Sequence, residues 1–263
     1  MVQPNISLAR KYQYSIKLDK TKDPECLIFE EYIKNLSDKL ADNISLNSNL
    51  KDVGGIYKII WIGSFITFKT NGNYIIKYPY YNRFNSDSME IENRMERFSR
   101  ATEVEFKSVK IIKEHSMDLV GDNLSRLIPD YVYMGNVYEC NFLVYKYIDG
   151  KSGNFLGNKI KGKTVSDLGK ILGSVNSTPH EENFVFRYKL HNIDNLLFDR
   201  KNFDKLVGIV DWESTRPIPH GADKTLYFAR RLFVRYKIEN EWNSFMKSYN
   251  GIISRGNMLY GKN

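Results

Sequence analysis

Apolar residues gather in several short runs, mostly in the first half of the chain, and turn residues separate some of these runs, which is typical of β-strands. The turn Asn71-Gly72-Asn73 separates two of these runs and is typical of a tight hairpin. We therefore expect a small antiparallel sheet. The runs that we expect to contribute strands lie at 56–62, 66–68, 74–77, 127–133 and 141–150.

Apolar residues recur at helical spacing in other segments, mostly in the second half. Thr164 and Ser166 are candidate caps for one of these helices. The residues at 43–50 look like a polar linker, and 214–219 looks like a polar, proline-containing loop. The expected helices lie at 26–40, 103–115, 164–177, 222–238 and 239–249.

A second hairpin, late in the chain, carries the most informative chemistry. Asn195 precedes an apolar run, a charged turn follows at 199–205, and a second apolar run at 207–210 ends at Asp211. This order places an amide and a carboxylate together at the open end of the hairpin. Mg²⁺ prefers hard oxygen ligands and keeps several waters, so Asn195 and Asp211 are our predicted magnesium ligands.

This segment resembles the catalytic core of the aminoglycoside phosphotransferase and choline kinase family, whose pattern is H-G-D-x-x-x-x-N, a hairpin, then I-D-W or I-D-F. Counted back from Asn195 without a gap, H-G-D falls on 188–190, which reads Tyr-Lys-Leu. With a one-residue insertion, the aspartate position falls on Lys189. The family's catalytic carboxylate is therefore absent. Asp194 and His191 are the weak candidates for the base role, and the alternative is that Asp194 caps the turn and His191 packs beneath the loop.

The resemblance also implies an ATP site. Lys77, at the end of an expected strand, would reach the α and β phosphates and pair with Glu105, for which Glu103 is the alternative. Gly63 and Ser64 would lie near the phosphates. The other residues that the resemblance implicates are Gly54–Gly55 as an alternative phosphate loop, Tyr145, Lys146 and Tyr147 in an adenine-binding hinge, and Asp223 as a brace for the catalytic loop.

The fold class that these features imply is α+β, with a bilobal protein kinase-like architecture. A small antiparallel β-sheet forms the N-lobe, and the C-lobe is mainly helical. We expect an N-terminal extension with a helix at 1–50, the N-lobe at 51–140, the hinge at 141–150, and a C-lobe with the catalytic hairpin at 151–263. The C-lobe is short, which favours a compact acceptor site or a macromolecular acceptor on an open face.

Composition adds little to this interpretation. The chain has 263 residues and a net charge of +8, and its two cysteines, Cys26 and Cys140, do not have the spacing of a disulfide framework. The N-terminus lacks an apolar signal region, and no apolar run is long enough for a membrane span. A cytoplasmic protein without membrane contact is the expectation. Arg230, Arg231, Arg235 and Lys237 concentrate positive charge late in the chain.

Three functions stay open on these residues. The first is a phosphotransferase that uses ATP and Mg²⁺ to phosphorylate a hydroxyl of a small molecule. The second is a pseudokinase, impaired in catalysis, that acts as a nucleotide-binding regulatory module. The third is a nucleic-acid-associated protein that uses the basic C-lobe, although a solvated lysine-rich face is the commoner explanation of such charge.

Overall fold

The computed structural model describes residues 24–62, 65–80, 88–153, 160, 162–181, 184–190, 192–202, 204–219 and 224–260. The chain divides into two compact units. The first unit comprises Met1–Glu103 and Val132–Tyr147, and the second comprises Val104–Tyr131 and Ile148–Asn263. The first unit contains a five-stranded sheet and the second is mainly helical, so the predicted α+β class is confirmed.

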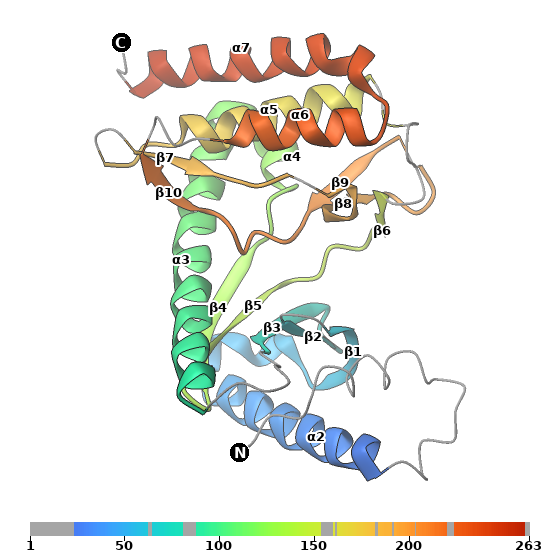
Figure 1. The fold of residues 1–263 in the computed structure, drawn as a ribbon, viewed down its shortest axis with the longest axis vertical. Helices are drawn as coiled ribbons and strands as arrows, with labels where there is room; N and C mark the ends of the chain where they lie inside the picture. Colours follow the sequence, from blue (N-terminus) through green and yellow to red (C-terminus); the bar gives the residue numbers. More distant parts are fainter. Residues whose placement is uncertain are drawn as a thin grey trace. The chain divides into compact units, whose positions relative to one another are not determined.

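The sheet of the first unit has the strand order β1-β2-β3-β5-β4 (Figure 1). Its β1–β2, β2–β3 and β3–β5 pairs are antiparallel. The turn between β4 and β5 places Tyr138 and Glu139 in the left-handed region, as a tight hairpin requires. The strands are β1 Ile56–Ile62, β2 Phe65–Thr70, β3 Tyr74–Pro79, β4 Tyr131–Val137 and β5 Cys140–Lys146.

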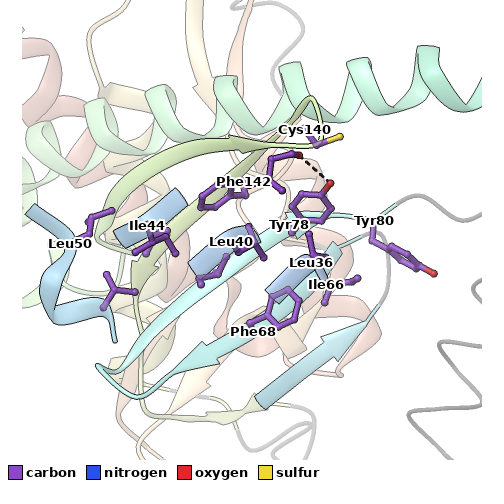
Figure 2. Packing of buried hydrophobic residues seen from close by; sticks show 14 of the residues in the cluster. Leu36, Leu40, Ile44, Leu50, Ile66, Phe68, Tyr78, Tyr80, Cys140 and Phe142 are labelled. Carbon is purple, nitrogen blue, oxygen red and sulfur yellow. Dashed lines mark hydrogen bonds between the residues drawn. The ribbon is translucent and has the colours of Figure 1, made fainter. Parts of the chain in front are cut away.

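Helix α2, Pro24–Ser45, supplies one side of the first unit's apolar core. Leu36, Leu40 and Ile44 recur every four residues and are buried, as a helix with one apolar face requires. Figure 2 shows these side chains gathered with Phe68 and Phe142 from the sheet. The predicted helix at 26–40 is therefore confirmed.

The predicted polar linker at 43–50 is wrong, because α2 continues to Ser45 and the 3-10 helix η2 follows at Ser48–Val53. Asn43 looks polar in the sequence but has partners in the sheet. Its amide donates a hydrogen bond to the carbonyl of Asn136 and accepts one from the hydroxyl of Tyr133. These bonds satisfy the polar side chain where the helix meets the strands.

The second unit is built around two packed helices, α5 and α7. Gly169 and Gly173 lie one turn apart on α5, and a Cβ atom at either would come within 2.5 to 2.8 Å of a backbone carbonyl oxygen of α7. Glycine is therefore required for this close approach. The helices are α3 Ser88–Val120, which the boundary between the units divides, α4 Asp122–Ser125, α5 Lys163–Ser177, α6 Thr225–Arg235, 3-10 helix η7 Glu239–Glu241 and α7 Trp242–Tyr260.

Two small sheets accompany these helices (Figure 1). The hairpin predicted to carry Asn195 and Asp211 is confirmed as β8 and β9, which pair antiparallel. The predicted loop at 214–219 is wrong, because its last residues form strand β10, which pairs with β7. Proline is tolerated in a two-stranded sheet because both strands are edges. The strands are β6 Lys151–Ser152, β7 Phe184–Arg187, β8 Leu196–Phe198, β9 Leu206–Ile209 and β10 Arg216–Pro219.

Helix boundaries also differ from the predictions. The predicted helix at 103–115 is part of the longer α3, and the one at 239–249 is part of α7. Gly162 occupies the N-cap of α5 without a side-chain hydrogen bond, so Thr164 and Ser166 are not its caps. Thr164 instead donates to the backbone carbonyl of Asp204. Within the part of the chain that the structure describes, no helix has both the length and the apolarity for a membrane span.

Candidate functional site

The open end of the β8–β9 hairpin brings Asn195 and Asp211 together, as the sequence predicts. Leu196 pairs with Ile209, and the next backbone hydrogen bond outward joins Val210 N to Asn195 O at 2.8 Å. The amide Nδ2 of Asn195 lies 3.3 Å from the carboxylate Oδ2 of Asp211 and donates a hydrogen bond to it. The two side chains thus converge, and rotation of the amide by 180° would place its oxygen on the same side.

Asp211 has an unusual backbone conformation that its neighbours hold in place. Its φ of 64° lies in the left-handed region, which costs a non-glycine residue about 1 kcal/mol. The indole of the fully buried Trp212 donates to the carbonyl of Ile209. Asp211 itself is exposed. The chain therefore reverses sharply at 211, with the indole fixed in the core and the carboxylate directed to the surface of the second unit.

Tyr188 lies beneath this turn and connects its parts. Its ring packs on Trp212 with centroids 4.3 Å apart, and its hydroxyl donates to the carbonyl of Val210 at 2.7 Å. Burial raises the pKa of the Tyr188 phenol well above its ordinary value, and the negative charge of Asp211 raises it further, while a hydrogen bond with Asn195 lowers it. The phenol is therefore a neutral donor that braces both predicted magnesium ligands.

The donor set fits Mg²⁺. Asn195 and Asp211 offer one amide oxygen and one carboxylate, and Mg²⁺ commonly takes one or two protein carboxylates with waters and phosphates in its other positions. The described residues contain no group of three or more His, Cys, Asp or Glu able to hold a metal ion. A site of this kind needs no such group, because an amide and one carboxylate supply the protein's share. The assignment of the two ligands stays a prediction.

The structure shows where the candidate bases lie. Leu190, at the family's aspartate position in the ungapped alignment, is fully buried. Both carboxylate oxygens of Asp194 accept hydrogen bonds, one from Ser152 at 3.0 Å and one from Asn192 at 2.9 Å. These bonds suit the role of a turn brace. His191 lies outside the described residues.

The predicted nucleotide contacts of the first unit fall mainly on β3 and β5. Lys77 is buried, with Nζ 4.1 Å from the centre of the Phe65 ring. Tyr145 and Lys146 lie on β5 opposite β3, and the backbone amide of Tyr147 donates to Asn73 O at 2.8 Å. Tyr145, Lys146 and Tyr147 therefore lie beside the start of β3, whereas Lys77 lies opposite Leu143, farther along the strand. Gly63 and Ser64 lie outside the described residues.

The alternative phosphate loop, Gly54–Gly55, serves the hairpin turn of the first unit. Gly55 O accepts a hydrogen bond from Asn71 N at 2.9 Å. A Cβ atom on Gly72 would lie only 1.8 Å from the carbonyl oxygen of Asp52, so the turn packs directly on this segment. Gly54 has a φ of 68°, which its lack of a side chain permits. The backbone conformation of Gly54 and the close approach of Gly72 to this segment are therefore explained without a phosphate.

Glu105 is a fully buried carboxylate in the part of α3 that belongs to the second unit. Its Oε1 accepts a hydrogen bond from the hydroxyl of Tyr131 at 2.5 Å, and the Tyr131 ring stacks on Phe106. Glu103 is half-buried. Burial of a charged group requires specific partners, so the structure favours Glu105 over Glu103 for a specific role. Its pairing with Lys77 stays a prediction.

Three site features escape an analysis of the sequence. The bracing hydroxyl of Tyr188 acts on a backbone carbonyl, and Ser152 and Tyr131 bind Asp194 and Glu105 from segments far away in the chain. The only sequence signal of the Tyr188 hydroxyl's role is a tyrosine directly before the predicted catalytic loop, which ends at Asn195. Asp223, predicted as a brace, lies outside the described residues.

Comparison of the sequence with protein-family models and with curated proteins found no match. Solved structures that resemble the chain include a mutant of aminoglycoside 2′-phosphotransferase-IIIa in complex with GDP. It has 12% identity and a TM-score of 0.45, over 86% of this chain and 96% of that one. An aminoglycoside phosphotransferase from Alicyclobacillus acidocaldarius has 10% identity and a TM-score of 0.43, over 75% of this chain and 74% of that one.

WbdD also resembles the chain, with 13% identity and a TM-score of 0.46, over 76% of this chain and 46% of that one. Aminoglycoside phosphotransferases, the family that the sequence resembles, are thus among the structures similar in fold. Values of this size describe a likeness of fold and do not place the chain in that family.

Proposed function

We propose that this protein is a kinase-like phosphotransferase that binds ATP with Mg²⁺ and transfers the γ-phosphoryl group to a hydroxyl of an acceptor. The observation that carries the proposal is the convergence of Asn195 and Asp211 at the end of the β8–β9 hairpin, with Nδ2 and Oδ2 3.3 Å apart. A buried amide and an exposed carboxylate in contact form a small, oriented oxygen site. Bound Mg²⁺ would there neutralise charge on the phosphates.

Each residue of the proposed site would have a separate role. Asn195 and Asp211 would hold the ion, and Tyr188 would keep the turn at Asp211 in its left-handed conformation. Lys77 would offer a positive charge to the phosphates. Phosphoryl transfer depends mainly on positioning and charge stabilisation, so such a site retains the main elements of catalysis without a dedicated base.

A second candidate function is a pseudokinase that binds nucleotide as a regulatory module. One observation favours it, the full burial of Leu190 at the position of the family's catalytic aspartate. Asp194 is engaged by Ser152 and Asn192, so it is not presented to a substrate by the described loop. The variant Leu190→Asp would bury a charge and destabilise the loop, so it is a poor test of restored activity.

Nucleotide binding is tested by thermal denaturation with ATP, with and without Mg²⁺. A ligand that binds only the folded state at a hundredfold excess over its Kd stabilises it by about 2.7 kcal/mol, which raises Tm by several degrees. We expect that rise to depend on Mg²⁺ and to disappear in Asp211→Ala. The control is Asp204→Ala, which removes an exposed carboxylate from the turn of the same hairpin. An equal rise in both variants would refute the predicted ligand role.

Turnover then separates the two candidates. A phosphotransferase releases ADP faster when its acceptor is added, and Asp211→Ala abolishes this stimulation. A pseudokinase shows the Mg²⁺-dependent rise in Tm with no ADP release above that of Asp211→Ala. The two functions therefore share the binding result and differ in the kinetic one.

A further inference from the structure

The sheet formed by β7 and β10 holds two arginines directly opposite each other. Arg187 at the end of β7 is the cross-strand partner of Arg216 at the start of β10. Directly opposed side chains of an antiparallel pair lie on the same face, and like charges in that arrangement are destabilising. Arg187 is half-buried with its Nε atom enclosed, whereas Arg216 is exposed. An anion that accepts hydrogen bonds from both guanidinium groups would be held by two positive charges.

Lys189 extends this cluster toward the catalytic loop. It follows Arg187 by two residues and immediately follows Tyr188, which contacts Asn195 and Val210. The pKa of Lys189 is lowered, first by burial and then by the positive charges of Arg187 and Arg216, while Glu213 raises it. Arg187 and Arg216 therefore act electrostatically on Lys189, and the negative charge of Glu213 offsets part of their effect on it.

Helix α6 adds further positive charge beside the cluster. Its sequence, TLYFARRLFVR, contains three arginines and no acidic residue. Nζ of Lys189 lies 5.7 Å from the centre of the Phe228 ring, so the cluster adjoins this helix. Arg230, Arg231 and Arg235 are exposed, and each guanidinium lies over an aromatic ring. The hydroxyl of Tyr236, just after α6, hydrogen-bonds to Asn192 in the catalytic loop at 3.3 Å.

These positions define the basic cluster as Arg187, Lys189 and Arg216, next to the loop that carries the predicted magnesium ligands. We propose that the basic cluster binds the anionic group, phosphate or carboxylate, of a small hydroxyl-bearing acceptor. The proposal rests on the phosphotransferase function above and gives its acceptor a chemical class. Paired arginines suit such a group because the guanidinium forks donate two parallel hydrogen bonds. A polycationic acceptor, such as an aminoglycoside, would be repelled here.

Inorganic phosphate is the best probe of the basic cluster, because it carries the charge of the proposed group and has no further atoms that could clash with the protein. Isothermal titration of the full chain without nucleotide should detect binding of phosphate, and acetate in a parallel titration distinguishes carboxylate from phosphate. We expect Arg216→Gln to weaken phosphate binding about tenfold and Arg187→Gln/Arg216→Gln to abolish it. Arg216 is exposed, so the single variant tests the site without disturbing the core.

Two controls separate this site from others. Arg200→Gln removes an equal charge from an exposed ion pair with Asp149 and should leave phosphate binding unchanged. Lys77→Met removes a predicted nucleotide contact in the first unit and should also leave it unchanged. If Lys77→Met abolishes phosphate binding and Arg216→Gln does not, phosphate occupies the nucleotide site and the proposal is wrong. Absence of phosphate binding to the native protein equally overturns it.

A nucleic-acid ligand gives a different result. A single-stranded oligonucleotide that binds with strong salt dependence, is weakened by Arg231→Gln/Arg235→Gln and is not displaced by phosphate would replace the proposal with a nucleic-acid surface on α6. Failure of the ATP and Mg²⁺ shift, with phosphate binding still dependent on Arg216, would refute the proposed function and leave the anion site intact. The two failures are thus distinguishable.

Discussion

The core of the first unit and the predicted catalytic loop of the second place buried tyrosines in very different surroundings. In the first unit, Tyr78 lies in an apolar cluster and donates to the carbonyl of Val137 at 3.3 Å (Figure 2). In the second, Tyr188 donates to the carbonyl of Val210 at 2.7 Å, next to the predicted ligand Asp211, and has a hydrogen bond with the other predicted ligand, Asn195. Both bonds satisfy a buried hydroxyl.

The hydrogen bonds of Tyr78 and Tyr188 differ in the part of the structure that each one stabilises. Tyr78 and its neighbour Cys140 complete a core of aliphatic and aromatic side chains, where shape and apolar area determine stability. Tyr188 holds a turn in which Asp211 adopts a left-handed backbone conformation. Strained residues persist when surrounding contacts over-determine them, and they gather at functional sites. The same phenolic bond therefore stabilises the fold in one unit and orients a carboxylate in the other.

The largest loss of folding free energy is expected in the apolar core of the first unit, where packing determines stability. Leu36 is fully buried in α2, so Leu36→Ala should lower the free energy of unfolding by about 3 kcal/mol, through lost transfer energy and the cavity left behind. Leu46→Ala is the matched control, because Leu46 is 86% exposed, and its effect should stay under about 0.5 kcal/mol. Urea denaturation measures both. Similar losses in the two variants would mean that α2 does not pack on the sheet as described.

The sequence predicts the strands and the central pair of the site because these depend on local patterns. Apolar runs and a Gly-containing turn identify β2 and β3, and the second hairpin places Asn195 and Asp211 together. Both features require only residues close in the chain. Helix α5 follows equally from its own periodicity.

Features that depend on distant partners could not be predicted in this way. Strand β10 contains Pro217 and Pro219, which indicate a loop until the edge strand β7 is known to lie beside it. Asn43 appears suited to a linker, yet its amide binds the carbonyl of Asn136 on a strand 93 residues away. The role of Tyr188 was hidden for the same reason, since its partner is a carbonyl and not a side chain.

The stability of the first unit's core should depend on pH through Cys140. Burial raises the pKa of the Cys140 thiol from 9.0 to about 11. The folded state therefore favours the protonated thiol, whereas the unfolded thiol ionises above pH 9. This contribution is complete below pH 9 and is lost as pH rises through 11, a fall of at most about 2.7 kcal/mol. Urea denaturation from pH 8 to 11, in a Cys26→Ser background, measures it.

The control for this pH dependence is Cys140→Ala in the same background. It lacks the thiol, so its free energy of unfolding should fall less steeply between pH 9 and 11. Burial also raises the pKa of the Tyr78 phenol, and Cys140 contributes to that rise, so the difference between the two proteins measures the thiol together with its effect on Tyr78. Parallel curves for the two proteins would show that Cys140 does not titrate differently in the folded and unfolded states.

Removal of one tyrosine hydroxyl in each unit should change stability least, and it compares the two units most directly. Tyr188→Phe and Tyr78→Phe each remove one buried hydroxyl and leave one carbonyl without that donor, at a cost of about 1 to 2 kcal/mol. Only Tyr188→Phe also releases the turn at Asp211, so only this variant should lose the Mg²⁺-dependent rise in Tm with ATP. Tyr78→Phe, equally destabilised, should keep that rise. Loss of the rise in both variants would attribute it to general stability, and its retention in both would show that the Tyr188 hydroxyl does not orient the predicted magnesium ligands.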